Sequence, residues 1–125
     1  MTLDQAIEAF IDRPCQETAT ALRDEAETYA KDGMISEAER EALLFSAAIG
    51  IAYPDSIVKA DGTPFVRPAF TEDDTVFTTG FYWTNLDGDS FYFDSYAGAA
   101  ADLAQDIGMD EAEAREVIAA GKAVC

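Results

Sequence analysis

Residues 76–96, VFTTGFYWTNLDGDSFYFDSY, hold 8 of the 14 aromatic side chains of this chain. β-Branched and aromatic residues on both sides of an Asp-Gly pair are the strongest short-range signal for a β-hairpin. Asp87 and Gly88 form that pair, and they can adopt the positive φ values of a two-residue type I′ turn. Because a lone two-stranded hairpin is barely stable in water, we expect at least one face to pack on other elements.

A two-residue loop at these positions also predicts the register, in which Trp83 faces Tyr92 and Tyr82 faces Phe93. Side chains alternate between the two faces of a strand. One face would carry Val76, Tyr82, Leu86, Phe91 and Phe93, and the other would carry Phe77, Phe81, Trp83, Tyr92 and Tyr96. One face is expected to pack on helices. The other is either a second small core or mixed surface, or in part a partner-binding patch, which favours Tyr and Trp.

Helix-terminus signals divide the chain before the hairpin. Thr2 and Gln5 form a capping-box pattern that opens a first helix, which ends near Asp12 because the residue before a proline leaves the α region. Pro14 is expected at the first position of a second helix, and Gly33 is expected to end it. Three helices are therefore predicted before the sheet, since the chain after this glycine is again helical in pattern.

The third predicted helix begins with a second capping box, Ser36 with Glu39, and runs to about Tyr53. It includes the apolar run ALLFSAAIGIAY and is expected to be the most buried helix. Part of this region, from Asp32 to Glu39, also matches the second half of an EF-hand calcium loop. Ala30 would occupy a ligand position of that loop without a side-chain oxygen, so we predict a helix-turn-helix here and no calcium site.

Short strands are predicted at Ser56–Val58 and Phe65–Val66, followed by the hairpin. Two further helices follow, the first ended by Gly108 and the last by Gly121. The sequence therefore predicts an α+β fold in a single domain, residues 1–125. It consists of an N-terminal three-helix segment, a small antiparallel sheet built around a β-hairpin, and two C-terminal helices.

The charge of the chain is strongly one-sided. Asp and Glu total 25 against 8 Lys and Arg, which gives a net charge of -17 and a pI of about 4.1. The acids are spread along the sequence, so the whole folded surface is expected to be negative. Such a surface repels nucleic acid and anionic membranes, and it attracts basic proteins. We therefore expect a basic protein or nucleoprotein complex as the partner, with no direct binding to nucleic acid or membrane.

Catalytic signatures are absent from the sequence. The chain has no histidine, which is the commonest general base and a common metal ligand. It also has no glycine-rich phosphate-binding motif. We expect no enzyme activity, no cofactor and no metal. The first residues show no signal-peptide pattern and no stretch is long enough to span a membrane, so we expect a cytoplasmic protein. Cys15 and Cys125 are accordingly expected to be reduced thiols.

In size, charge and lack of catalytic motifs the chain resembles a class of small acidic inhibitors encoded by phages and mobile elements. That class includes anti-restriction and anti-CRISPR proteins that mimic nucleic acid. The resemblance implies a non-catalytic inhibitor that binds a basic nucleic-acid-binding protein and blocks its nucleic-acid site, acting in the host-cell cytoplasm as a monomer or weak dimer. DNA carries one charge per ~1.7 Å of axis, so a competitor needs a dense array of carboxylates.

Aromatic residues beside acids are the candidate partner-binding positions, because they combine desolvated anchors with electrostatic attraction. The candidates are Tyr82, Trp83, Asp87, Asp89 and Tyr92 on the hairpin, and Glu72, Asp73 and Asp74 in the acidic turn before it. Helical acids at suitable spacing add Glu17, Asp24 and Glu27 on the second helix, and Glu37 and Glu41 on the third.

Two alternatives remain open at this point. The chain also resembles acidic immunity proteins and antitoxins, which block basic nuclease toxins. The acidity is equally typical of a salt-adapted accessory or structural protein that has no nucleic-acid competitor. The gene neighbourhood separates the first two, and capture of a nucleic-acid-binding partner separates both from the third.

Overall fold

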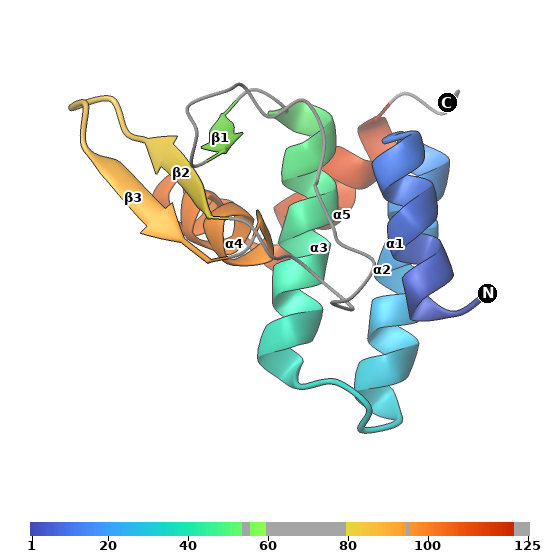
Figure 1. Cartoon of the computed structure of the whole chain (residues 1–125). Helices are drawn as coiled ribbons and strands as arrows, with labels where there is room; N and C mark the ends of the chain where they lie inside the picture. The colour runs from blue at the N-terminus through green and yellow to red at the C-terminus, as the bar shows by residue number, and fades with distance from the viewer. Residues whose placement is uncertain (54–55, 60–79, 95, 122–125) are drawn as a thin grey trace.

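The computed structural model of the chain describes residues 1–53, 56–59, 80–94 and 96–121 (Figure 1). In chain order its elements are α1 (Leu3–Asp12), α2 (Gln16–Lys31), α3 (Glu37–Ala52), β1 (Ile57–Lys59), β2 (Phe81–Thr84), β3 (Ser90–Phe93), α4 (Tyr96–Asp106) and α5 (Glu111–Ala120). This order confirms the predicted α+β fold, with helices on both sides of a small antiparallel sheet in the sequence. Within the described ranges, no helix is both long and apolar enough to cross a membrane. The predicted strand Phe65–Val66 and the hairpin residues Val76 and Phe77 lie outside them.

Capping boxes begin α1 and α3 at the predicted residues. The Thr2 hydroxyl accepts a hydrogen bond from the Gln5 amide at 3.2 Å, and Gln5 Oε1 accepts one from the Thr2 amide at 2.9 Å. Ser36 and Glu39 make the same reciprocal pair at the start of α3, at 3.1 and 3.3 Å. Each pair satisfies two amide groups that have no acceptor inside the helix.

The start of α2 differs from the prediction, because its first residue is Gln16 and Pro14 lies before the helix. Cys15 is the N-cap, with an extended backbone. The Thr18 hydroxyl accepts a hydrogen bond from the Cys15 amide at 3.1 Å and donates one to the Arg13 carbonyl at 2.6 Å. These bonds stabilise a non-helical turn around the proline, and this local network outweighs the preference of proline for a first helical position.

Gly33 ends α2 as predicted. Its φ of 75° lies in the left-handed region, where a residue without Cβ is favoured. The Gly33 amide donates to the Ala30 carbonyl at 3.1 Å, and the Met34 amide donates to the Tyr29 carbonyl at 2.8 Å. This pair of bonds is a Schellman motif. The residues that resembled half of a calcium loop are therefore a helix end followed by the cap of α3.

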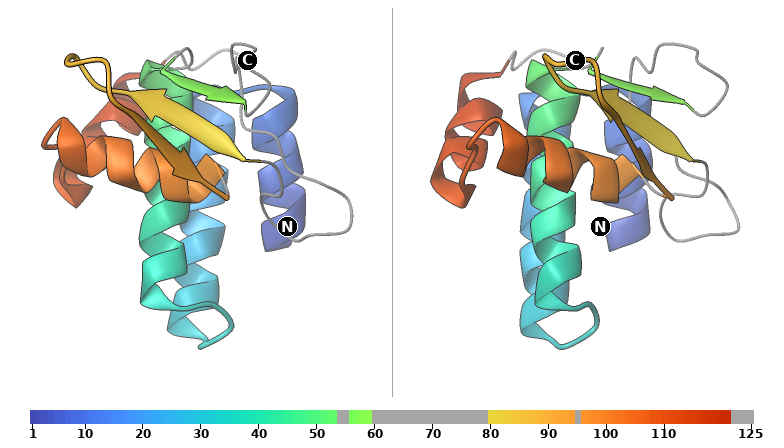
Figure 2. Two further views of the ribbon diagram at one scale, coloured as in Figure 1. Left: turned by 60° about the vertical axis from the view of Figure 1, so that its left-hand side comes forward. Right: turned by 90° about the vertical axis from the view of Figure 1, so that its left-hand side faces the viewer.

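The third helix, α3, is the centre of the helical layer, as its apolar sequence predicts. It contacts α2, α4 and α5 (Figure 1). Seven of its residues are buried: Leu43, Leu44, Ser46, Ala47, Ala48, Ile49 and Gly50. Figure 2 shows the sheet in front of α4, which itself packs against α3. The order of layers is thus sheet, α4, then α3 with its other neighbours.

The hairpin exists, but its predicted loop and register are wrong. In the structure Trp83 is opposite Phe91 and Tyr82 is opposite Tyr92. Gly88 has a φ of 89°, whereas no described residue other than glycine has a positive φ. Asp87 therefore does not adopt the conformation that a type I′ turn requires. The loop is the longer segment from Asn85 to Asp89, closed by the Gly88 amide donating to the Asn85 carbonyl at 3.1 Å.

This shift of one residue changes which side chains share a face. Phe81, Trp83, Phe91 and Phe93 lie on one face, whereas Tyr82 and Tyr92 lie on the other. Phe81 and Trp83 are buried, and Phe93 packs partly against the same core. The prediction that one aromatic face packs on helices is confirmed, but the residues on that face differ from those predicted. Tyr96, which was expected on the opposite strand face, is instead the first residue of α4.

The expectation of a reduced thiol at Cys15 is wrong, because Cys15 is disulfide-bonded in the structure. The side chain of Cys15 is also buried, with 2% exposed. Cys125, the other cysteine of the chain, lies outside the described residues. Sequence spacing reveals metal and redox motifs, but it does not show whether a cysteine forms a disulfide in the folded chain.

Candidate protein-binding surface

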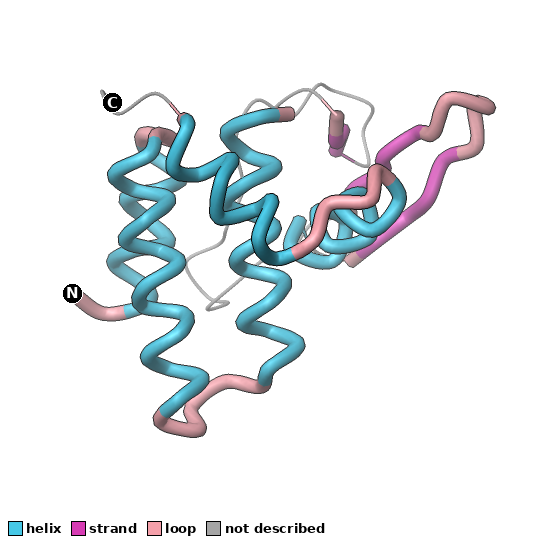
Figure 3. Tube along the Cα trace, turned by 180° about the vertical axis from the view of Figure 1, so that it is seen from behind, coloured by secondary structure: helices cyan, strands magenta, loops and turns pink. Residues whose placement is uncertain are grey.

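The β2–β3 hairpin projects beyond the helices (Figure 1, Figure 3). It carries exposed apolar side chains. Leu86, Phe91 and Tyr92 are 106%, 41% and 53% exposed. Asp87 and Asp89 are exposed beside them. Contiguous exposed apolar residues rimmed by polar residues mark candidate interaction sites. We call the set Tyr82, Leu86, Asp87, Asp89, Phe91 and Tyr92 the hairpin surface; it includes both faces of the hairpin, because Phe91 lies on the face opposite Tyr82 and Tyr92.

The loop that presents these residues is held by hydrogen bonds within the hairpin. The Asn85 amide donates to the Asp89 carbonyl at 3.0 Å, and Asn85 Oδ1 accepts a hydrogen bond from the Asp89 amide at 2.9 Å. Thr84 and Ser90 add a hydroxyl–hydroxyl bond at 2.9 Å across the last strand pair. A loop fixed in this way presents Leu86 in a defined place, which lowers the entropy cost of binding.

The outward aromatic face of the hairpin is ordered by a pair of tyrosines. The rings of Tyr82 and Tyr92 lie 5.1 Å apart between centroids, tilted by 58°. Gly80 provides the space for this arrangement, because a Cβ atom at that position would overlap the Tyr92 ring. Aromatic side chains with few free torsions supply contact area at low entropy cost. Tyr92 is thus both exposed and positioned, as a binding anchor requires.

Trp83 does not belong to this surface, although it was one of the predicted partner-binding residues. Its side chain is only 2% exposed. The indole stacks on Phe91 with 4.8 Å between ring centroids, and its N–H donates a hydrogen bond to Asp102 Oδ2 at 2.9 Å. Trp83 therefore supports the hairpin from beneath by joining β2 to α4.

The other predicted residues fall into two groups. Tyr82, Asp87, Asp89 and Tyr92 lie on the β2–β3 hairpin. Glu72, Asp73 and Asp74 lie outside the described residues. Leu86 and Phe91 are also exposed, although neither was among the predicted partner-binding residues. An isolated leucine in an otherwise polar turn was the available signal for Leu86, and the shifted register concealed the position of Phe91.

The acids singled out on the helices are in most cases paired with arginines of the same chain. Asp24 lies 3.0 Å from Arg23, Glu27 pairs with Arg115, and both Glu37 and Glu41 lie within 4.0 Å of Arg40. Only Glu17 of this set has no such pair among the described residues. Exposed ion pairs of this kind contribute little stability, but they neutralise part of the local charge.

Arg40 is the most enclosed of these arginines, with 12% of its side chain exposed. Its Nε lies 2.6 Å from Glu37 Oε1, and Nη2 lies 2.6 Å from Glu111 Oε1 on α5. The hydrogen bond to Glu37 raises the pKa of Arg40 above its ordinary value; burial lowers it, and Glu111 raises it further. This cluster joins α3 to α5.

In contrast, Asp87 and Asp89 have no ion pair within the part of the chain that the structure describes.

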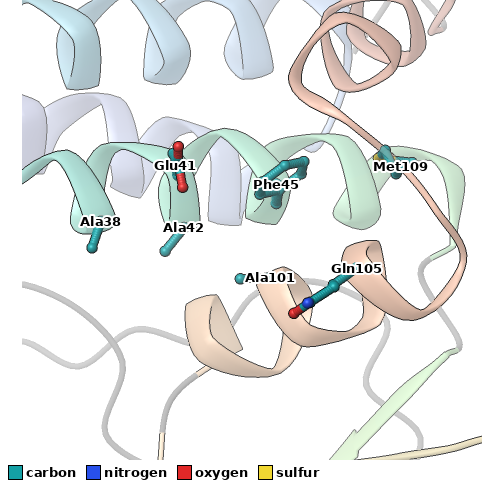
Figure 4. Close-up of a pocket in the computed structure, with 7 residues that line it drawn as sticks. All are labelled: Ala38, Glu41, Ala42, Phe45, Ala101, Gln105 and Met109. Atoms are coloured by element: carbon teal, nitrogen blue, oxygen red, sulfur yellow. The ribbon is translucent and has the colours of Figure 1, made fainter.

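A groove of about 410 Å³ lies between α3 and α4 (Figure 4). It is lined by Ala38, Glu41, Ala42, Phe45, Ala101, Gln105 and Met109. Small and apolar side chains form most of the lining, and Glu41 and Gln105 are its polar groups. The groove has no pair of titratable groups suited to acid–base catalysis. Across the described residues, no group of three or more His, Cys, Asp or Glu side chains is placed to hold a metal ion.

Comparison of the chain with family models, with curated proteins and with solved structures found no match.

Proposed function

We propose that this protein is a non-catalytic acidic inhibitor that binds a basic, nucleic-acid-binding protein and blocks its nucleic-acid site. The observation that carries this proposal is the hairpin surface, where Leu86, Phe91 and Tyr92 are exposed near Asp87 and Asp89. These two carboxylates form no ion pair with any other described residue. Aromatic and apolar anchors contribute affinity once they are desolvated, and nearby charges select the partner and speed its approach.

The charge of the whole chain supports the same proposal. A net charge of -17 on 125 residues gives a field that attracts basic surfaces and repels nucleic acid itself. A protein with this field competes with DNA for a basic groove by mass action, so inhibition is stoichiometric. A phage or mobile-element protein directed against a host defence complex, of the anti-CRISPR or anti-restriction type, is the setting we propose.

We propose that the protein acts in the host-cell cytoplasm. The disulfide at Cys15 would be exposed to reduction there. Disulfides persist in oxidising compartments, whereas cytosolic thiols are kept reduced. If the protein acts in a cytoplasm, inhibition must survive reduction of the Cys15 disulfide. The DNA-displacement assay described below is therefore run both with and without a reducing agent.

The test is displacement of DNA from a captured partner. The tagged chain is used at low salt to capture proteins from host lysate. Each captured protein is released from the chain at high salt, returned to low salt and loaded with a fluorescent DNA duplex. Added chain should release the DNA at a one-to-one ratio of chain to partner, and released DNA is measured by fluorescence anisotropy. Capture of no nucleic-acid-binding protein, or capture without DNA release, contradicts the proposal. Release only from a toxin encoded beside this gene would identify an immunity protein instead.

A further inference from the structure

The strand β3 is at the edge of the sheet. The strand order is β1-β2-β3 and both pairings are antiparallel. On its outer side β3 pairs with no other strand within the described ranges of the chain, and Figure 1 shows this side facing away from the helical layer. An unpaired edge presents a row of backbone N–H and C=O groups that can accept another strand.

The backbone groups on this edge can be assigned. The Asn85 amide donates to the Asp89 carbonyl, so these two residues form a hydrogen-bonded pair. Hydrogen-bonded and non-hydrogen-bonded pairs alternate along an antiparallel ladder. Phe91 and Phe93 therefore direct their backbone groups toward β2, whereas Ser90 and Tyr92 direct theirs toward the free edge.

The edge lacks most of the devices that prevent strand addition. Natural edges are protected by very short strands, lysine, proline, bulges or inward-pointing charges. β3 has the sequence SFYF, which contains no lysine, proline or charge; its short length is the one such device that it has. Instead, Phe91 and Tyr92 are exposed along it. The strand is four residues long, which limits an added strand to a short segment.

We propose that the free edge of β3 binds an extended, lysine- or arginine-bearing segment of the partner protein as an added β-strand. This inference rests on the proposed function and names how the hairpin surface engages its partner. Main-chain bonds to Ser90 and Tyr92 supply affinity in this mode of recognition, and side chains supply specificity. Asp89 and Asp94 are exposed at the two ends of the strand, where they attract basic side chains, and a cation can also stack on Tyr92.

A second copy of this chain is a poor occupant of the same edge. Two copies would each bring a net charge of -17. Antiparallel self-pairing through the outward groups, with Tyr92 opposite its own copy, would place Asp94 opposite Ser90 and next to Asp89 of the other copy at both ends. Like charges held this close repel each other. Charge complementarity therefore selects a basic segment over self-association.

The test uses two synthetic peptides and the wild-type chain. One is a short acetylated peptide of alternating lysine and valine, and the other is the same peptide N-methylated at every residue. The two have equal charge and side chains, but the second has no backbone donors. The unmethylated peptide should bind about tenfold more tightly, since two or more main-chain bonds are lost on methylation. It should also shift the amide resonances of Ser90 and Tyr92 in isotope-labelled protein.

Substitutions at Ser90 provide a matched pair of variants. Ser90→Pro removes the outward amide and is compatible with an edge strand, whereas Ser90→Ala retains that amide. Binding of the unmethylated peptide should be lost in the first and retained in the second. Thermal melts test whether both variants are folded. If Ser90→Pro does not fold, the comparison of the two peptides on wild-type protein still tests the proposal.

Equal affinity for the two peptides, or dimerisation of the chain through β3 in sedimentation experiments, overturns strand addition. Failure of the proposed function is distinct from this, because it is measured as absence of DNA displacement. If DNA is displaced but the peptides bind equally, strand addition is wrong and the inhibitor proposal stands. If the peptides differ as expected but no DNA is displaced, strand addition stands and the inhibitor proposal is wrong.

Discussion

The indole N–H of Trp83 donates a hydrogen bond to Asp102 Oδ2 at 2.9 Å, and this bond joins the hairpin to α4. The two residues are far apart in the sequence and belong to different layers. Trp83 is buried, while Asp102 is partly exposed. The bond therefore fixes the orientation of the sheet that carries the hairpin surface, and it assigns Trp83 a structural role.

Replacing Trp83 by Phe should lower the free energy of unfolding by about 1–3 kcal/mol, because the carboxylate of Asp102 loses its donor and the ring loses volume. Urea denaturation followed by circular dichroism measures the change. Asp102→Asn is the matched control, since its side-chain oxygen still accepts the indole hydrogen bond and should cost less. A loss of partner binding with unchanged stability would show that Trp83 contacts the partner directly.

The conformation of the hairpin loop predicts opposite behaviour for two adjacent residues. Gly88 has a φ of 89°, so Gly88→Val should lower the free energy of unfolding by about 1 kcal/mol or more. Asp87 has no positive φ, so Asp87→Val should change stability by less than about 0.5 kcal/mol. Thermal melts of both variants make the comparison. Similar losses in the two would indicate the type I′ turn that the sequence first suggested.

How far the sequence predicts this fold depends on whether the signal is local. The capping boxes at Thr2 and Ser36 and the helix end at Gly33 were predicted because each is completed within a few residues. The hairpin was also predicted correctly, but the predicted register was wrong, since a two-residue and a longer loop both accommodate Asp-Gly. A shift of one residue then moved Tyr82 and Trp83 relative to their expected neighbours.

The candidate surface was predicted only in part for the same reason. Asp87 and Tyr92 were identified from residue type alone, and both are exposed. The position of Trp83 depends on α4, where Asp102 accepts the hydrogen bond of its indole. Composition and spacing contain no information on such contacts, because they arise from the packing of whole elements.

Reduction of the chain should lower its stability measurably. Cys15 is disulfide-bonded and buried at the start of α2. Removing a native disulfide costs about 2–5 kcal/mol in small domains, so the melting temperature should fall by several degrees in the presence of a phosphine reductant. Cys15→Ser should melt near the reduced wild-type temperature and should not respond to the reductant. An unchanged melting temperature, or free thiols in titration of the unreduced protein, would contradict the disulfide.

The last prediction concerns how the hairpin acids act on a partner. Asp87 and Asp89 are exposed and have no ion pair within the described residues, so they act through long-range attraction. The double substitution Asp87→Asn with Asp89→Asn should slow association with a captured partner several-fold, roughly, and leave the melting temperature unchanged. Stopped-flow or surface binding kinetics at increasing salt measures the rate, and the difference from wild type should shrink as the screening length falls below ~8 Å.

A matched control for this experiment is Glu8→Gln with Glu116→Gln, which removes the same charge from exposed positions on α1 and α5. Both helices lie away from the hairpin in Figure 1. If only the total charge of the chain steers association, the two double variants should slow it equally. If the hairpin surface is the site of contact, the Asp87 and Asp89 variant should be slower, because those charges lie nearest to the basic groups of the partner in the encounter complex. Equal rates would therefore place the contact elsewhere on the chain.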